Sequence, residues 1–186
     1  MRRIRDITPR MRRITLSGAE LDAFESAAGS HPEFAAPGFD DHVKLIFASD
    51  GDIAGAVPRQ LTHGIEWGPS ETRLGRDYTP RRIERTDAGI ELDLDFVLHG
   101  EGPAASWAGA AVPGDPLWFV GPKSSTVLPD GLDWVLLAGD ETALPAIGRY
   151  LDERPSEAPV RVVVLVEDAA AKQQLALRAG DRVEWI

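Results

Sequence analysis

The 186-residue chain contains no cysteine. Its absence excludes disulfide bonds, a thiol nucleophile and an iron–sulfur cluster held by cysteine ligands. Any electron-transfer function would therefore need an added organic cofactor. Lysine is also scarce, because the whole chain contains three. Two of them, Lys44 and Lys123, are considered below as candidate binding residues.

Long apolar segments are missing as well. No run approaches the roughly 20 residues that a membrane-spanning helix needs. The arginine-rich N-terminus lacks the apolar core and the small-residue cleavage site of a secretory signal. We therefore expect a cytoplasmic protein without a membrane span.

The charge balance is acidic, with a net charge of −10 and an isoelectric point near 4.8. This balance argues against a nucleic-acid partner. Six arginines nevertheless lie within the first 13 residues. They are interleaved with apolar residues such as Ile4, Ile14 and Leu16, which is typical of a half-exposed strand. A basic arm is the alternative interpretation.

Short alternating segments dominate the chain as far as Gly121. The expected strands cover residues 12–16, 43–47, 76–85, 90–98 and 117–120. Glycine and proline separate many of them, and such a set favours a small β-barrel. The segment 48–75 has weak periodicity and several glycines and prolines, so we expect a long loop there.

The clearest alternation lies in residues 91–98. Every second residue from Leu92 to Leu98 is apolar, so these side chains share one face. The other face carries Glu91, Asp93 and Asp95. This pattern predicts an antiparallel strand with one side in solvent.

The C-terminal part has a different pattern. An apolar run at 134–138 is typical of a parallel strand covered on both faces. The expected elements that follow are a helix over 144–151, a strand over 160–166, a second helix over 168–177 and a third strand over 181–186. Alternating strands and helices predict an α/β domain. Three strands are few for such a domain, so we expect it to be incomplete, in a shortened protein or a piece of a longer one.

Three segments carry residues suited to binding a flavin dinucleotide. In the first, Arg76 and Tyr78 lie on the same side of a strand, and Thr79 follows them. An arginine can form two hydrogen bonds to a pyrophosphate, a tyrosine can stack on an isoalloxazine ring, and a hydroxyl can reach its polar edge. A half-buried tyrosine beside an exposed arginine is the plainer interpretation. Pro80 favours an edge strand.

The second segment runs from Val97 to Ala108. Pro103 can begin a helix there, and small residues before it would let a diphosphate approach the free amides at the helix start. His99 could flank a nucleotide, or it could simply be a hydrogen-bonded residue at the end of a strand. For Trp107 we favour a place in the core over a stacking role.

The third segment joins a strand to a helix through Gly139, Asp140, Glu141 and Thr142. The Thr142 hydroxyl could cap the helix or contact a flavin. In α/β dinucleotide domains this loop normally receives phosphates. The two acids would repel a pyrophosphate, so the loop is weak evidence for NAD(P)H binding.

Taken in order, RDYTPRR at 76–82, VLHGEGPAASWA at 97–108 and LLAGDETALPAI at 136–147 resemble the flavin-binding signature of the siderophore-interacting proteins. These are FAD-dependent ferric-siderophore reductases related to ferredoxin reductases. The resemblance covers nearly the whole chain and includes the family's DETALP form. It implies a six-stranded antiparallel Greek-key FAD-binding barrel over residues 1–125 and a partial NAD(P)-binding-like α/β domain over 126–186. The family normally continues for several tens of residues.

The resemblance also implies a set of site residues. Those expected to bind FAD are Arg76, Tyr78, Thr79, Val97, His99, Gly102, Pro103, Ala104, Ala105, Ser106 and Thr142. No metal site and no proton-transfer catalyst are expected. Many ferric siderophores are anionic, so we expect Lys44 and Lys123, with Arg81 and Arg82 near the barrel rim, to attract them. Scattered solvated cations are the alternative.

The expected function is reduction of ferric siderophores. Electrons would pass from NAD(P)H or a reduced ferredoxin through FAD to chelated Fe(III), which would release the iron. Two alternatives remain. The chain could hold FAD with little turnover, or it could be a flavin reductase that acts on another acceptor.

Overall fold

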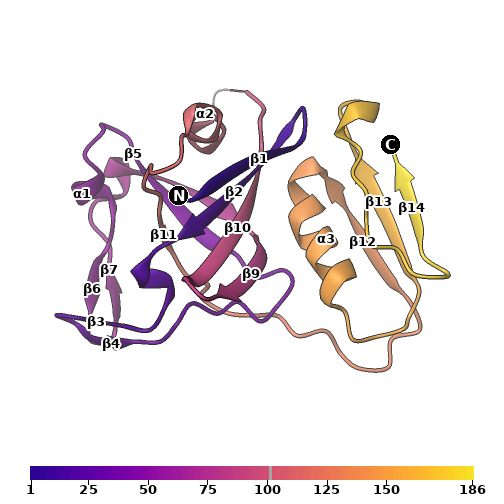
Figure 1. The fold of residues 1–186 in the computed structure, drawn as a ribbon, viewed down its shortest axis with the longest axis horizontal. Helices are drawn as coiled ribbons and strands as arrows, with labels where there is room; N and C mark the ends of the chain where they lie inside the picture. The colour runs from indigo at the N-terminus through magenta and orange to yellow at the C-terminus, as the bar shows by residue number, and fades with distance from the viewer. Residues whose placement is uncertain (101) are drawn as a thin grey trace.

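The computed structural model describes residues 1–100 and 102–186. Antiparallel sheets form the N-terminal part, and a parallel sheet with one helix forms the C-terminal part (Figure 1). The antiparallel part has a four-stranded sheet in the order β1-β2-β10-β9 and a three-stranded sheet in the order β11-β5-β8. Their bounds are β1 (Arg3–Thr8), β2 (Met11–Ser17), β10 (Gly89–Val97), β9 (Pro80–Thr86), β11 (Trp118–Val120), β5 (Val43–Ala48) and β8 (Arg73–Tyr78).

These two sheets differ from the expected single six-stranded barrel, because in the described part of the chain no hydrogen-bonded ladder joins them. The expected strand over 76–85 is in fact two strands. β8 ends at Tyr78 in one sheet, and β9 begins at Pro80 in the other. Pro80 has no N–H to donate to a continuing ladder, and the chain crosses between the sheets at Thr79.

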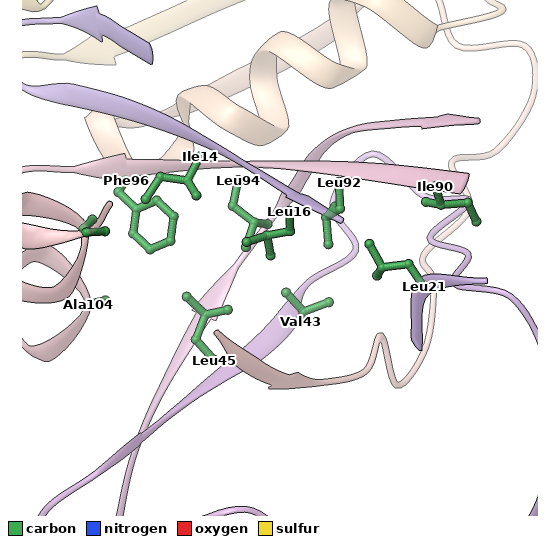
Figure 2. Close-up of a cluster of buried hydrophobic side chains, with 12 residues drawn as sticks. Ile14, Leu16, Leu21, Val43, Leu45, Ile90, Leu92, Leu94, Phe96 and Ala104 are labelled. Atoms are coloured by element: carbon green, nitrogen blue, oxygen red, sulfur yellow. The ribbon is translucent and has the colours of Figure 1, made fainter. Parts of the chain in front are cut away.

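The N-terminal core lies between these sheets (Figure 2). Leu92, Leu94 and Phe96 of β10 are fully buried and face Val43 and Leu45 of β5. The period of two in the sequence places all three β10 residues on one face. Burying a side chain of this size stabilises the fold by about 1.5–3 kcal/mol.

The opposite face of β10 is buried too, contrary to the expected solvent side. Glu91, Asp93 and Asp95 are 7%, 5% and 3% exposed. Asp95 accepts two hydrogen bonds from Arg13, at 2.6 and 2.7 Å, and Asp93 accepts one from Thr15. Strand β2 supplies both of these partners, and Arg3 of β1 donates to Glu91 at 3.1 Å. Each buried acid is therefore hydrogen-bonded, two of them to a charged group.

The expected loop over 48–75 contains short elements instead. It holds α1 (Ile53–Ala56), a hairpin of β6 (Arg59–Leu61) and β7 (Gly64–Glu66), and the 3-10 turn η2 (Ser70–Thr72). A second small hairpin joins β3 (Phe24–Ser26) and β4 (Gly29–His31), after the turn η1 (Ala19–Leu21). Elements of three or four residues are too short to show periodicity in a sequence.

The C-terminal part is a parallel sheet in the order β12-β13-β14. It consists of β12 (Val135–Asp140), the turn η3 (Glu141–Ala143), α3 (Leu144–Glu153), β13 (Val160–Leu165), the turn η4 (Ala169–Ala171) and β14 (Arg182–Trp185). Pro145 lies in the first turn of α3, where its missing N–H costs nothing. Buried residues of α3 pack against Val160, Val162 and Val164.

The expected second helix over 168–177 is wrong. Only η4 forms there, and an extended segment leads from Lys172 toward β14. Asp168 caps η4 by accepting from the Ala170 and Ala171 amides. Ala171 is buried and Leu175 packs against the core of the parallel sheet, whereas Leu177 remains 40% exposed. The segment therefore buries these apolar side chains without forming a helix.

Helix α3 lies between the antiparallel part and the parallel sheet (Figure 1). The ring of Tyr150 packs edge-on against Phe39, with centroids 4.9 Å apart. The buried Arg149 side chain donates to the carbonyl oxygens of Pro80 and Ala36. The two parts of the chain therefore share a packed interface.

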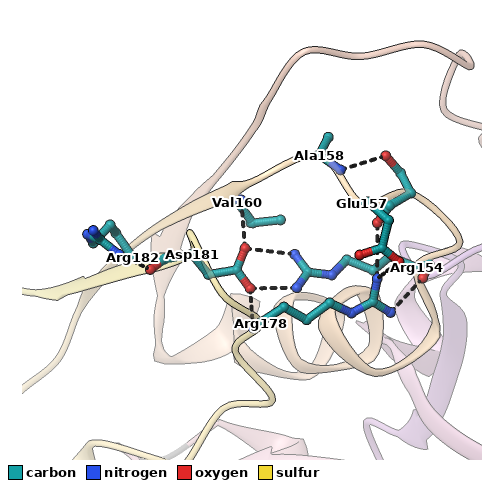
Figure 3. A network of polar contacts seen from close by, with 8 residues as sticks. Arg154, Glu157, Ala158, Val160, Arg178, Asp181 and Arg182 are labelled. Atoms are coloured by element: carbon teal, nitrogen blue, oxygen red, sulfur yellow. Dashed lines mark hydrogen bonds and ion pairs between the residues drawn. The ribbon is translucent and has the colours of Figure 1, made fainter.

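A buried polar network fixes the far side of this unit (Figure 3). Arg154, just after α3, forms a salt bridge with Asp181 in which both side chains are 1% exposed. Asp181 also accepts from the backbone amides of Val160 and Arg178, at 2.9 and 2.6 Å. These bonds tie the end of α3 to the starts of β13 and β14.

Candidate functional site

The first segment lies at the end of β8. Tyr78 is half-buried, and its ring lies 4.5 Å from that of Phe96. Burial raises the pKa of Tyr78 to about 12, although the charge of Arg76 opposes the change. The phenol is therefore neutral at physiological pH and can offer an aromatic face beside a cation.

Arg76 is exposed, and its guanidinium donates to the Gly75 carbonyl oxygen at 2.7 Å. Among the described residues it forms no ion pair. Its remaining N–H groups can therefore bind a phosphate. Thr79 is half-buried at the crossing between the two sheets, one residue beyond Tyr78.

The second segment begins where β10 ends at the buried Val97. His99 is exposed, and Gly100 has φ of +57°, a conformation that favours glycine. Position 101 lies outside the described residues. A Cβ built at Gly100 or at Gly102 would meet nothing within 4 Å, so the space beside both backbones is open.

Helix α2 (Pro103–Ala110) begins directly after Gly102, with Pro103 in its first turn. Among the described residues, no side chain caps its N-terminus. Ala104 is buried in the core, so its backbone amide, rather than its methyl group, is the part that can face a ligand. Ala105 is half-buried and Ser106 is exposed. Free amides, small residues and open space together fit a diphosphate.

Trp107 belongs to the core, as favoured from the sequence. Its ring lies 5.6 Å from that of Phe96 and 6.3 Å from that of Phe47. The contacts of Phe96 with Tyr78 and Trp107 join the first segment to the second. The structure thus brings these two segments together through aromatic packing.

The third segment follows β12. Thr142 donates from both its amide and its hydroxyl to one carboxylate oxygen of Asp140, at 2.8 and 2.5 Å. These bonds, the side-chain bond first, lower the pKa of Asp140, and the charge of His99 adds to the effect. Asp140 rather than Thr142 is the capping residue here. Strand β10, which leads into the second segment, contacts the turn η3 of the third segment, so the two segments lie next to each other.

Glu141 was expected to repel a pyrophosphate, but its charge is compensated. It is 6% exposed and accepts from the Nε of Arg10, at 3.3 and 3.4 Å. Sequence reasoning missed Arg10, and no local signal could have identified it, because 131 positions separate the pair.

The chain matches two family descriptions. Residues 1–126 match the siderophore-interacting FAD-binding domain, and residues 132–186 match the siderophore-interacting protein domain. The chain belongs to the siderophore-interacting protein family. The match over residues 1–126 supports FAD as the cofactor of this family member.

Several relatives carry names that describe their activity. The NADPH-dependent ferric-chelate reductase of Escherichia coli is 36% identical over 99% of this chain and 68% of its own length. The ferric vibriobactin reductase ViuB of Vibrio cholerae is 31% identical over 97% of this chain and 62% of its own length. A crystal structure of a siderophore utilization protein from T. fusca has a TM-score of 0.82 and 34% identity, covering 100% of this chain and 66% of that one. The chain thus spans about two thirds of the length of these relatives.

The basic residues expected near the rim of this siderophore-interacting protein are mostly paired. Lys44 bonds Asp77 at 2.5 Å, Arg81 bonds Asp152 on α3 at 2.7 Å, and Arg82 bonds Glu84 at 2.7 Å. Arg81 also lies against the backbone of Gly148, so it belongs to the interface between the two parts rather than to an open rim. Lys123 is exposed and forms no ion pair with any described residue.

The described part of the chain has no cluster of three or more histidine or acidic residues that could hold a metal ion. None of the helices in residues 1–100 and 102–186 is long and apolar enough to cross a membrane.

Proposed function

We propose that this chain binds FAD and acts in the reduction of ferric siderophores. The observation that carries the proposal is the open, glycine-flanked start of α2, which lies beside an aromatic cluster ending in Tyr78. The names of the relatives support the same activity. When bound, FAD would supply electron transfer from NAD(P)H or a reduced ferredoxin to chelated Fe(III).

In the proposed site, each of the three segments contacts FAD. Arg76 binds phosphate, Tyr78 stacks on the flavin ring, and Thr79 hydrogen-bonds the polar edge of that ring. The residues from Gly102 to Ser106 bind the diphosphate through backbone amides, with Val97 and His99 flanking the nucleotide. Thr142 offers acceptor lone pairs to the flavin, because its hydroxyl proton is donated to Asp140.

For the siderophore we propose an anionic ferric chelate that is attracted by Lys123 and Lys44. The exposure of Lys123 supports this role directly. Lys44 would have to share its charge with Asp77. We also propose that residues 1–125 form the FAD-binding domain and 126–186 the partial NAD(P)-binding-like domain, in a cytoplasmic protein. The boundaries of the two family matches support that division.

A second candidate function is FAD binding with little turnover. It is favoured by the loop at 139–142, which has acids where a nicotinamide phosphate site normally has glycines. A third is a flavin reductase that acts on another acceptor, favoured by the pairing of Lys44, Arg81 and Arg82 with acids. NADPH is the donor that the E. coli relative's name suggests.

One sequence of measurements tests these proposals. The protein is titrated with FAD, and the visible absorbance of bound flavin is recorded. NADPH, NADH or reduced ferredoxin is then added anaerobically as the electron donor. A ferric siderophore, free flavin or a quinone is added afterwards as the electron acceptor. Absence of bound flavin would refute the proposal at its first step. NAD(P)H oxidation no faster than with free FAD would favour the second candidate, and preference for flavin or quinone the third.

A further inference from the structure

Arg10 lies in the turn between β1 and β2 and reaches across to the third candidate segment. Its Nε donates to both carboxylate oxygens of Glu141, at 3.3 and 3.4 Å. Glu141 is 6% exposed, and the Arg10 side chain is 29% exposed. The pair is therefore largely shielded from water, where an ion pair is screened less than at the surface.

The backbone of Arg10 is tied to the second candidate segment. Its carbonyl oxygen accepts from the Leu98 amide at 2.7 Å, immediately before His99. Its own amide donates to the Thr8 hydroxyl at 3.2 Å, which orders the turn. Arg10 thus contacts the end of β10 through its backbone and the loop after β12 through its side chain.

Glu141 is tied to the parallel sheet in the same way. Its Oε1 accepts from the Glu167 amide, just beyond β13, at 3.0 Å. Glu141 is also the residue between Asp140 and Thr142, whose hydrogen bonds shape the loop. A movement of the Glu141 carboxylate would therefore be transmitted to Thr142.

We propose that Arg10 and Glu141 are positioning residues that fix the 139–142 loop relative to the 97–106 segment. They do this by holding the loop of one unit against the end of β10 in the other. The inference rests on the proposed flavin site, since it assigns the pair the task of keeping the two halves of that site in register. Neither residue needs to touch the flavin.

The chain provides a matched control for this role. Arg81 and Asp152 form another ion pair between the same two parts, at 2.7 Å, and the Arg81 side chain is 18% exposed. That pair joins β9 to the last turns of α3, and among the described residues its hydrogen bond involves neither the 97–106 nor the 139–142 segment. If any ion pair between the two parts were enough to position the 139–142 loop, loss of either pair would have the same effect on that loop.

The first test measures hydrogen exchange in the protein without flavin. Arg10→Ala should speed amide exchange at Thr142 and Glu167, whereas Arg81→Ala should leave these amides as in the unaltered protein. Equal exchange in all three proteins would overturn the proposal. Because this measurement needs no FAD, it tests the positioning role of Arg10 and Glu141 even if the proposed function fails.

The second test measures FAD affinity and the visible spectrum of bound flavin. Arg10→Ala should raise the Kd for FAD about tenfold and shift the flavin bands. Arg81→Ala should change neither. If both variants weakened FAD binding equally, the ion pairs would only hold the two parts of the chain together, and the proposal would be contradicted. An unchanged FAD affinity in Arg10→Ala would also contradict it.

Glu141→Gln provides a second variant that keeps the size of the side chain. It should weaken FAD binding in the same direction, and combining it with Arg10→Ala should add little further loss, since both variants lose the ion pair between Arg10 and Glu141. Fully additive losses would show that the residues act separately. If the unaltered protein binds no FAD, the proposed function fails. The positioning role of Arg10 and Glu141 is then tested by the hydrogen-exchange measurement alone.

Discussion

Asp181 and Arg154 meet in a salt bridge whose two side chains are each 1% exposed. The carboxylate also accepts from two backbone amides, so one acid ties the end of α3 to the starts of two strands of the parallel sheet (Figure 3). We predict that Asp181→Ala lowers the free energy of unfolding by about 3–5 kcal/mol, because it leaves the Arg154 charge buried without a partner. Urea unfolding measures this loss. Glu157→Ala, which removes an exposed partner of Arg178, should cost less than about 1 kcal/mol.

The Asp181 carboxylate also makes the stability of the protein depend on pH. The hydrogen bond to Arg154 is the largest cause that lowers the pKa of Asp181 from 3.8 to about 2. A lowered folded-state pKa stabilises the protein above the unfolded value, and this contribution is lost as the pH falls from about 4 toward 2. Unfolding curves between pH 5 and pH 2 should show the loss. Asp181→Ala should show a smaller dependence over that range, and an unchanged dependence would contradict the assignment.

Arg76→Ala should weaken FAD binding about tenfold, because it removes an exposed guanidinium that has no acidic partner among the described residues and is proposed to bind the phosphate. Its effect on stability should be small. The matched control is Arg82→Ala, since Arg82 is also an arginine near the rim but is paired with Glu84. Fluorescence titration with FAD compares the two variants, and equal affinities would remove Arg76 from the site.

Tyr78 should matter through its ring. Tyr78→Phe keeps the aromatic face and the packing against Phe96, so FAD affinity should change by less than about threefold. Tyr78→Ala should weaken binding by at least about tenfold and also lower stability through lost packing. The comparison uses FAD titration with thermal unfolding recorded alongside. Equal affinities of the Phe and Ala variants would argue against stacking.

Lys123→Ala should spare FAD binding and raise the KM for an anionic ferric siderophore. The increase should shrink in high salt, since the attraction is electrostatic. A neutral chelate serves as the control substrate. Asp77→Asn should act in the opposite direction on KM, because it frees Lys44 from its 2.5 Å bond. An unchanged KM in both variants would remove these lysines from the substrate site.

Much of the architecture could be predicted from local patterns. The alternation of Leu92, Leu94 and Phe96 correctly identified a buried strand face, and Pro145 correctly marked the first turn of α3. The three segments also indicate the family from the sequence alone. These features depend on neighbours within a few residues, so a linear pattern contains them.

Other features depended on partners distant in the chain. Asp95 is buried because it is paired with Arg13, which lies 82 positions away in the sequence. Glu141 is buried because it is paired with Arg10, which lies 131 positions away. The segment 168–177 is expected to be a helix from its place in the strand and helix order, but only the short turn η4 forms there. A pattern predicts which face a side chain occupies, but whether a charge on that face is solvated or paired depends on which strand packs there. Only the tertiary structure settles that question, because burying a charge is favourable only when its partner comes with it.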